Sequence, residues 1–263
     1  PLHVRAATDV GVAIVELLRV FTKPGDKVLF SSPVYQNFYT WMRETHVEMV
    51  DVPFRIDSKS SDQTGWSHDW AGIEAAYKSG IAVHLLCSPH NPLGKVYTSE
   101  ELLRIVELAK QYGVVVISDE IHAPLTFKEQ PFIPFLSVSE AAAEVGVAVS
   151  AASKGWNIAG LKCAIIISQT EKMHEKLNQL PPALHYRASL LGAFATVAAF
   201  EKGEPWLDQA IEILDENRQL IANLITARIP SVKYAMPHCS YLAWLDLSAL
   251  NLGEDPGAML IEK

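Results

Sequence analysis

The 263-residue chain is long enough for one large α/β domain or two smaller ones, and its 49% hydrophobic and 20% charged residues are ordinary for a globular protein. Its 30 acidic and 22 basic residues give a net charge of −8, which argues against a surface that binds nucleic acid or an anionic membrane. The three cysteines lack C-x-x-C spacing and no apolar run could span a bilayer, so we expect a cytoplasmic protein without a metal site.

Hydrophobic spacing and turn residues divide the chain into short helices and strands. The helix that begins near residue 9 is expected to be capped by Thr8 or Asp9, and the helix over 99–112 by Ser99. In chain order the predicted elements are a helix over 9–22, a strand over 27–30, a helix over 35–45, a strand over 47–52, a loop over 57–66, a strand over 81–87, a helix over 99–112, a strand over 114–118, a helix over 137–144, strands over 145–149 and 164–167, helices over 171–180, 188–201 and 205–229, and strands over 232–235 and 241–247.

Short strands rich in Val and Ile that alternate with amphipathic helices indicate an α/β fold with a mostly parallel sheet, flanked by helices on both faces. Beyond the last of these strands, long helices and two further strands suggest a small α+β unit. We therefore expect a large domain over residues 1–200 and part of a small domain over residues 201–263. Three aromatic residues are expected in the core of the small domain: Trp206, Tyr241 and Trp244.

Three predicted strands end in polar segments. These segments are SPHNPLG at 88–94, SDEIH at 118–122 and SAASKGWN at 150–157. In open α/β sheets, ligands collect beyond the carboxyl ends of the strands. The three segments, on consecutive strand ends, therefore predict one shared site.

The three segments resemble the signature of fold-type-I pyridoxal 5′-phosphate (PLP) enzymes, the class I/II aminotransferase superfamily. Within it, the chain resembles the MalY/PatB group of cystathionine β-lyases, also called cysteine-S-conjugate β-lyases. The resemblance covers essentially the whole chain and implies the aspartate-aminotransferase-like fold. The phrases that carry it are PVYQNFY (33–39), LLCSPHNPLGKVYTSEEL (85–102), VISDEIH (116–122), SKGWNIAGLK (153–162), GEPWLD (203–208) and YLAWLDLSALN (241–251).

The resemblance implies roles for five residues around the cofactor ring. Lys154 would carry PLP as a Schiff base and act as general base, unless it is a solvated surface lysine. Asp119 would pair with the pyridine nitrogen and keep the ring protonated, unless it only caps a helix or turn. Asn91 would hydrogen-bond the phenolic oxygen, near which His122 would also stand; the alternatives are an Asn-Pro turn and a core histidine. Tyr35 would stack on the ring or simply pack in the core.

The resemblance also implies where the cofactor phosphate would lie. Thr8, Asp9 and Val10 open a predicted helix, and helix N-termini bind anions through free N–H groups. Ser153 would add a hydroxyl group. Lys162 occupies the place where many relatives carry a phosphate-binding arginine.

The activity that the resemblance implies is β-elimination from cystathionine or a cysteine S-conjugate, giving a thiol, pyruvate and ammonia. His122, which stands where many aminotransferases have tyrosine, favours this reading. An aminotransferase acting on amino acids, with a keto acid as second substrate, remains an alternative. A non-catalytic regulator is a further alternative, although the sequence has no visible helix-turn-helix segment or basic arm. The resemblance also implies a homodimer.

Both ends of the chain look incomplete, since it starts abruptly at Pro1 and stops at Lys263 within a stretch that still resembles a helix. The superfamily holds the substrate carboxylate with an arginine close to its C-terminus, and none of the arginines present aligns with that position. The N-terminal segment that usually supplies an aromatic residue to the partner subunit is also missing. We therefore expect a fragment of a longer protein.

Overall fold

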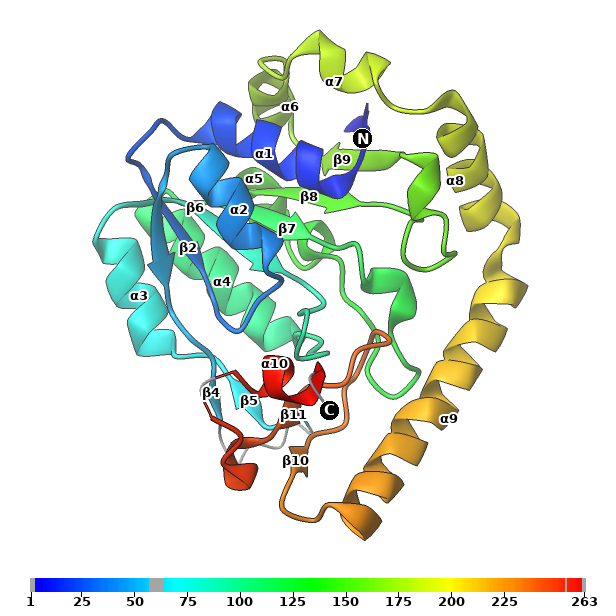
Figure 1. Ribbon diagram of the computed structural model, residues 1–263. Coiled ribbons are helices and arrows are strands. Elements are labelled where there is room, and N and C mark those ends of the chain that lie inside the picture. The colour runs from blue at the N-terminus through cyan, green and yellow to red at the C-terminus, as the bar shows by residue number, and fades with distance from the viewer. Residues whose placement is uncertain (1–2, 57–63, 254, 262–263) are drawn as a thin grey trace.

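A central sheet of seven strands forms the middle layer of the protein. The computed structural model describes residues 3–56, 64–253 and 255–261 (Figure 1). In these residues the strand order of the sheet is β1-β9-β8-β7-β6-β2-β3. Its strands are β1 (His3–Ala7), β2 (Lys27–Phe30), β3 (Glu48–Asp51), β6 (Ile81–Cys87), β7 (Val115–Asp119), β8 (Gly146–Ser150) and β9 (Ala164–Ser168).

The sheet is mostly parallel, as the sequence predicts. Strands β3, β2, β6, β7 and β8 run in the same direction, whereas β9 runs antiparallel to both of its neighbours, β8 and β1. Strands β6, β7 and β8 are adjacent, so their carboxyl ends meet at one edge of the sheet. In the register of these strands Cys87 lies opposite Asp119, and Asp119 lies opposite Val149.

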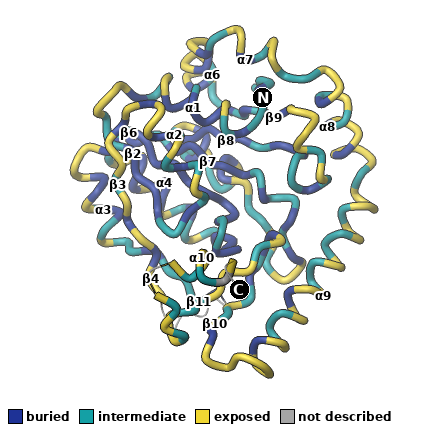
Figure 2. The backbone as a smooth tube through the Cα atoms, in the orientation of Figure 1, coloured by how far each residue is buried: buried dark blue, intermediate teal, exposed yellow. Residues whose placement is uncertain are grey.

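Helices cover both faces of the sheet, and each face has its own apolar cluster. In Figure 2 the sheet and the inner sides of these helices form the buried interior. Ile14, Leu17 and Leu18 of the first helix are fully buried, and each contributes about 1.5–3 kcal/mol to folding. The helices on one face are α1 (Val10–Phe21), α2 (Asn37–Glu44), α6 (Glu171–Leu177) and α7 (Pro182–Tyr186), and those on the other are α3 (Trp70–Lys78), α4 (Ser99–Tyr112) and α5 (Glu140–Val145).

The start of α4 differs from the prediction, because Thr98 and not Ser99 is its N-cap. The Thr98 hydroxyl accepts a hydrogen bond from the Glu101 N–H, and the Glu101 carboxylate accepts one from the Thr98 N–H. This reciprocal pair satisfies two N–H groups that the helix leaves free. Glu101 also forms a 3.1 Å ion pair with the buried Lys95 ammonium, which fixes the loop after β6 onto the helix.

Short elements account for most of the other differences from the prediction. The helix predicted over 137–144 is a 3₁₀ turn, η2 (Phe135–Ser137), followed by α5. Strands predicted over 232–235 and 241–247 shorten to β10 (Lys233–Tyr234) and β11 (Leu245–Asp246), which pair antiparallel. Most of the loop predicted over 57–66 lies outside the described residues. Elements without a predicted counterpart are β1, α3, α7 and a hairpin of β4 (Arg55–Ile56) and β5 (Trp66–Ser67). The final helix α10 (Pro256–Ile261) lies in the last stretch of the sequence, which resembles a helix.

Two helices, α8 (Leu190–Lys202) and α9 (Glu204–Arg228), run along the outer edge of the molecule (Figure 1). They meet at Gly203, close to the predicted domain boundary, which stays a prediction. The three aromatic residues expected in a small-domain core are not buried: Trp206 is 51%, Tyr241 48% and Trp244 42% exposed. That prediction was wrong: Trp206 lies in the first turn of the outer helix α9, and the two-residue strands near Tyr241 and Trp244 form no closed layer that could cover their side chains.

Residues 237–240, which we call the bridging segment, join two loops of the sheet edge. The His238 N–H donates to the Gly94 carbonyl at 2.8 Å, and the His238 carbonyl accepts from the Phe127 N–H at 2.9 Å. The Ser240 N–H donates to the Leu125 carbonyl at 2.9 Å. The bridging segment therefore lies between the loop after β6 and the loop after β7, with backbone hydrogen bonds to both.

Arg218 of α9 anchors the same region. Its guanidinium donates to the Pro237 carbonyl at 2.6 Å and to the Glu129 carboxylate at 2.8 Å. It also lies 3.9 Å from the centre of the Phe127 ring, a cation–π arrangement. The side chain is 8% exposed, so its charge is desolvated and depends on these partners.

Gly94 is predicted to be indispensable for this packing. Its φ of +64° is left-handed, and an added Cβ would lie 2.2 Å from the Pro237 Cβ and 3.0 Å from the Cys239 carbonyl oxygen. We expect Gly94→Ala to lower the free energy of unfolding by about 3 kcal/mol or more, from strain plus overpacking. Guanidinium denaturation followed by circular dichroism measures it.

Gly113→Ala is the matched control for this variant. Gly113 has a φ of +72°, but an added Cβ would meet nothing within 4 Å. Gly113→Ala should therefore lower the free energy of unfolding only by the cost of the left-handed backbone conformation, about 1 kcal/mol. Equal losses for the two variants would show that the contact with the bridging segment does not matter.

Candidate active site

A cavity of about 460 Å³ lies where the carboxyl ends of β6 and β7 meet the start of α1. Of the predicted site residues, all but Thr8 line it. The sequence therefore located the cavity, although it could not fix the mutual distances. The predicted residues that line it are Asp9, Val10, Tyr35, Asn91, Asp119, His122, Ser153, Lys154 and Lys162.

The loop after β6 brings Asn91 to the cavity. The Asn91 N–H lies 3.3 Å from the Cys87 sulfur, and its side-chain nitrogen lies 3.3 Å from His122 Nε2. His90 connects the same loop to the loop after β2, since its ring nitrogen Nε2 lies 2.9 Å from the Pro33 carbonyl oxygen. Asn91 is thus fixed on both its backbone and its side chain.

The end of β7 supplies a buried carboxyl group and a buried imidazole. Asp119 is 4% exposed and accepts one hydrogen bond, from the Ile121 N–H at 3.2 Å. Burial raises the pKa of Asp119 to about 7, against the opposing effects of that hydrogen bond and of the Lys154 charge. Burial and the Lys154 charge lower the pKa of His122 to about 4, so its ring is neutral near pH 7. Within the described residues His122 Nδ1 has no hydrogen-bond partner.

The segment after β8 carries Ser153 and Lys154. It is tied to the outer helices by Trp156, whose indole N–H donates to the Gly203 carbonyl at 2.9 Å. The fit is close, because an added Cβ at Gly203 would lie 2.4 Å from that indole nitrogen. The Ser153 carbonyl accepts from the Ile158 N–H at 3.1 Å, which closes the turn.

The first turn of α1 forms another wall of the cavity. Asp9 is the N-cap, with its carboxylate accepting from the Val12 N–H at 2.9 Å. The second carboxylate oxygen lies 3.2 Å from the Lys162 ammonium. The first N–H groups of a helix have no partner inside the helix, so Val10 and Gly11 present donors that suit an anion.

Comparison with known proteins identifies the family. The model of the family described as aminotransferase class I and II matches residues 4–261. The chain belongs to this family. It is 33% identical to the cystathionine β-lyase of Corynebacterium glutamicum, covering all of this chain and 68% of that protein. It is 34% identical to protein MalY of Escherichia coli, covering 92% of this chain and 61% of MalY.

Solved structures of PLP enzymes share the fold of this protein. Cystalysin from Treponema denticola, whose structure contains PLP, superposes with a TM-score of 0.88 at 26% identity, over 94% of this chain and 62% of cystalysin. The chain spans 60% of the length of its mycobacterial relatives, to which it is 39–40% identical. The predicted membership of the MalY/PatB group is confirmed by these relatives.

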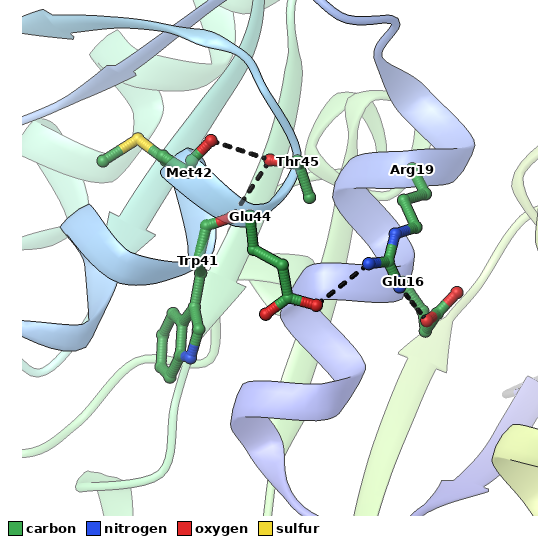
Figure 3. Close-up of polar contacts among 6 residues, drawn as sticks. All are labelled: Glu16, Arg19, Trp41, Met42, Glu44 and Thr45. Atoms are coloured by element: carbon green, nitrogen blue, oxygen red, sulfur yellow. Dashed lines mark hydrogen bonds and ion pairs between the residues drawn. The ribbon is translucent and has the colours of Figure 1, made fainter.

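Charged residues of α1 and α2 also line the cavity, although the sequence did not predict them. Arg19 pairs with Glu16 one turn earlier and with Glu44 of α2 at 2.9 Å (Figure 3). The Trp41 ring of α2 lies against Gly11 of α1, where an added Cβ would meet it at 2.9 Å. The Glu16–Arg19 spacing signals a pair on one helix face, but nothing local predicts Glu44 or Trp41.

In the part of the chain that the structure describes, no group of three or more His, Cys, Asp or Glu side chains could hold a metal ion. Across the same residues no helix combines the length and the apolar character that crossing a bilayer requires.

The raised pKa of Asp119 predicts how stability depends on pH in the ligand-free protein. Because the folded-state pKa of about 7 lies above the usual 3.8, this group stabilises the fold below pH 4 and loses that contribution as the pH rises through 7. The loss is at most about 4 kcal/mol for a shift of this size. Asp119→Asn should flatten this decline in unfolding free energy between about pH 4 and 7.

Glu120 is the comparison residue, since burial also raises its pKa to about 7 although it is absent from the cavity lining. Its carboxylate accepts hydrogen bonds from the Phe135 N–H and the Ser118 hydroxyl. Glu120→Gln should reduce the decline in unfolding free energy with pH by a further amount, because each carboxyl group contributes its own part of that decline. A slope that neither variant changes would contradict the assignment of the pH dependence to these two carboxyl groups.

Proposed function

We propose that this chain is the greater part of a PLP-dependent C–S β-lyase. Its substrate would be cystathionine or another cysteine S-conjugate, and its products a thiol, pyruvate and ammonia. The observation that carries the proposal is the meeting of Lys154, Asp119 and Asn91 on one cavity, from three neighbouring strand ends. Similarity to named cystathionine β-lyases supports it.

The residues around the cavity fit PLP. Burial raises the pKa of the Asp119 carboxyl group, and a protonated ring nitrogen placed against it would favour the charged carboxylate. The buried His122 Nδ1 lacks a hydrogen-bond partner in the described chain and could serve a polar group of a ligand. An aldehyde suits the Lys154 amine, and a phosphate suits the first turn of α1.

Each residue then has a place around the ring. Lys154 would hold the aldehyde carbon covalently, and Asp119 would keep a proton on the ring nitrogen. Asn91, whose amide nitrogen lies 3.3 Å from His122 Nε2, would donate to the phenolic oxygen. Tyr35 would lie on the ring face, where an aromatic side chain adds apolar contact.

The phosphate would take N–H groups of Val10 and the next residue of α1. The Asp9 carboxylate would repel a phosphate, but it caps the helix and pairs with Lys162, so we assign it a structural part. Lys162 would supply the cation and Ser153 a hydroxyl donor. Thr8 does not line the cavity, and its role stays a prediction of the sequence.

PLP, when bound, stabilises the electron pair that proton removal leaves at the substrate Cα. Lys154 Nζ, freed when the substrate amine takes its place, would accept that proton as general base. The Cβ–S bond then breaks, and its electron pair leaves with the sulfur as a thiolate, to which Lys154 can return the proton. The remaining three-carbon unit takes up water and gives pyruvate and ammonia.

An aminotransferase is the second candidate, because the family includes such enzymes and the same residues would serve both reactions up to proton removal. One observation favours the lyase: several relatives at 33% identity or more are named cystathionine β-lyases. A PLP-bound structure from Clostridium difficile that is described as an aminotransferase, at 30% identity, keeps the second candidate open.

The whole protein would act as a homodimer. Helix α8 supports this, since Leu190, Leu191 and Phe194 are each at least 66% exposed, and apolar groups gathered on a surface favour a partner. Light scattering of the full-length protein should give twice the chain mass. Leu191→Glu should shift it toward the monomer mass, and a monomeric wild type would contradict the proposal.

Incubation with L-cystathionine as the sole substrate tests the proposed reaction. A lyase should release pyruvate and thiol over many turnovers without any added keto acid. An aminotransferase should stop after one half-reaction, because the amine then remains on the cofactor. Pyruvate is measured with a coupled dehydrogenase, and a single stoichiometric burst that resumes on adding a keto acid would contradict the lyase.

Lys154→Ala and Lys172→Ala form a matched pair for the same assay. Lys154→Ala should abolish turnover and let the cofactor leave on dialysis, because both the covalent link and the base are removed. Lys172 is exposed on α6 and does not line the cavity, so Lys172→Ala should change neither the turnover nor the retention of the cofactor on dialysis.

A further inference from the structure

Tyr241 directly follows the bridging segment and stands beside the candidate active site. Its ring centre lies 6.0 Å from that of His122, at an interplanar angle of 50°. His122 lines the cavity together with Lys154, whereas Tyr241 does not line it. Tyr241 is therefore linked to the cavity, and to the proposed point of reaction at Lys154, through the ring of His122.

The backbone holds Tyr241 in this place. Cys239 is fully buried, Ser240 is 4% exposed, and the Ser240 N–H is bonded to the Leu125 carbonyl at 2.9 Å. Ser240 then adopts a left-handed φ of 78°, which turns the chain out of the buried segment. A residue other than glycine is uncommon in this conformation, which the surrounding hydrogen bonds maintain here.

The side chain of Tyr241 is half-exposed, at 48%. Among the described residues its hydroxyl forms no hydrogen bond, and the only aromatic ring that its ring contacts is that of His122. A half-exposed aromatic side chain on a fixed backbone, next to a cavity, is suited to contact a ligand.

We infer that Tyr241 is a specificity-determining residue whose ring contacts the thioether side chain of the substrate, beyond Cβ. This inference rests on the proposed function, since it takes Lys154 as the group that acts on the substrate Cα. Sulfur lies favourably at the edge or face of an aromatic ring, about 5 Å from its centre. The ring, and not the hydroxyl group, would supply the contact.

Two substrates separate this contact from the rest of the reaction. L-Cystathionine carries a thioether and a long leaving group, whereas β-chloro-L-alanine undergoes the same elimination with chloride as leaving group. In the full-length protein, Tyr241→Ala should lower kcat/KM for L-cystathionine about 3- to 10-fold, mainly through KM, and leave β-chloro-L-alanine unchanged. Tyr241→Phe should behave as wild type with both.

Tyr186→Ala is the control, because it removes the same side chain from an 87% exposed position on α7. Tyr186→Ala should leave kcat/KM unchanged for both substrates. Equal losses for both substrates in Tyr241→Ala, or no loss, would overturn the inference. The visible absorption of the bound cofactor, unchanged in Tyr241→Ala, would exclude a merely structural effect.

A wild-type protein that eliminates from neither substrate would contradict the proposed lyase and not yet the role of Tyr241. Binding of L-methionine and L-alanine, followed through the absorption of the bound cofactor, then decides. Tyr241→Ala should weaken binding of L-methionine alone. Equal weakening for both amino acids, or none, would overturn the inference.

Discussion

The parallel pairing of β6, β7 and β8 is the constraint on which the rest of the site depends. Because backbone hydrogen bonds fix Cys87 opposite Asp119 and Asp119 opposite Val149, three segments that are distant in sequence end at one edge. A slip of one residue would turn the Asp119 carboxyl group to the other face of the sheet. The apolar clusters on the two faces oppose such a slip. The packing that stabilises the core therefore also fixes the positions of the site residues.

Much of the fold and most of the site could be predicted, for reasons that are local. Apolar periodicity located α1 and α4 to within a residue or two, and runs of Val and Ile located the strands of the sheet. Polar residues directly after three strands then had to lie near one another, which is why Asn91, Asp119 and Lys154 were expected in one place. Their chemical roles came from resemblance and remain proposals.

What could not be predicted depends on contacts between distant parts of the chain. The edge strand β1 is recognisable only by its pairing with β9, and the two-residue strands β10 and β11 are too short for any periodicity. Arg19 of α1 reaches the cavity rim only because α2 packs beside it and presents Glu44. Tyr241 looked like a core residue from its apolar neighbours, whereas the turn at Ser240 takes it outward.

The bridging segment also has a consequence for the order of folding. Gly94 and His238 are joined by a backbone hydrogen bond but lie far apart in the sequence, so their contact closes a very long loop. Contacts of that kind form late, and a ribosome releases the second partner only after the whole sheet has emerged. The loops that carry Asn91 and His122 are therefore among the last parts of the chain to become ordered, after the sheet at whose edge they lie.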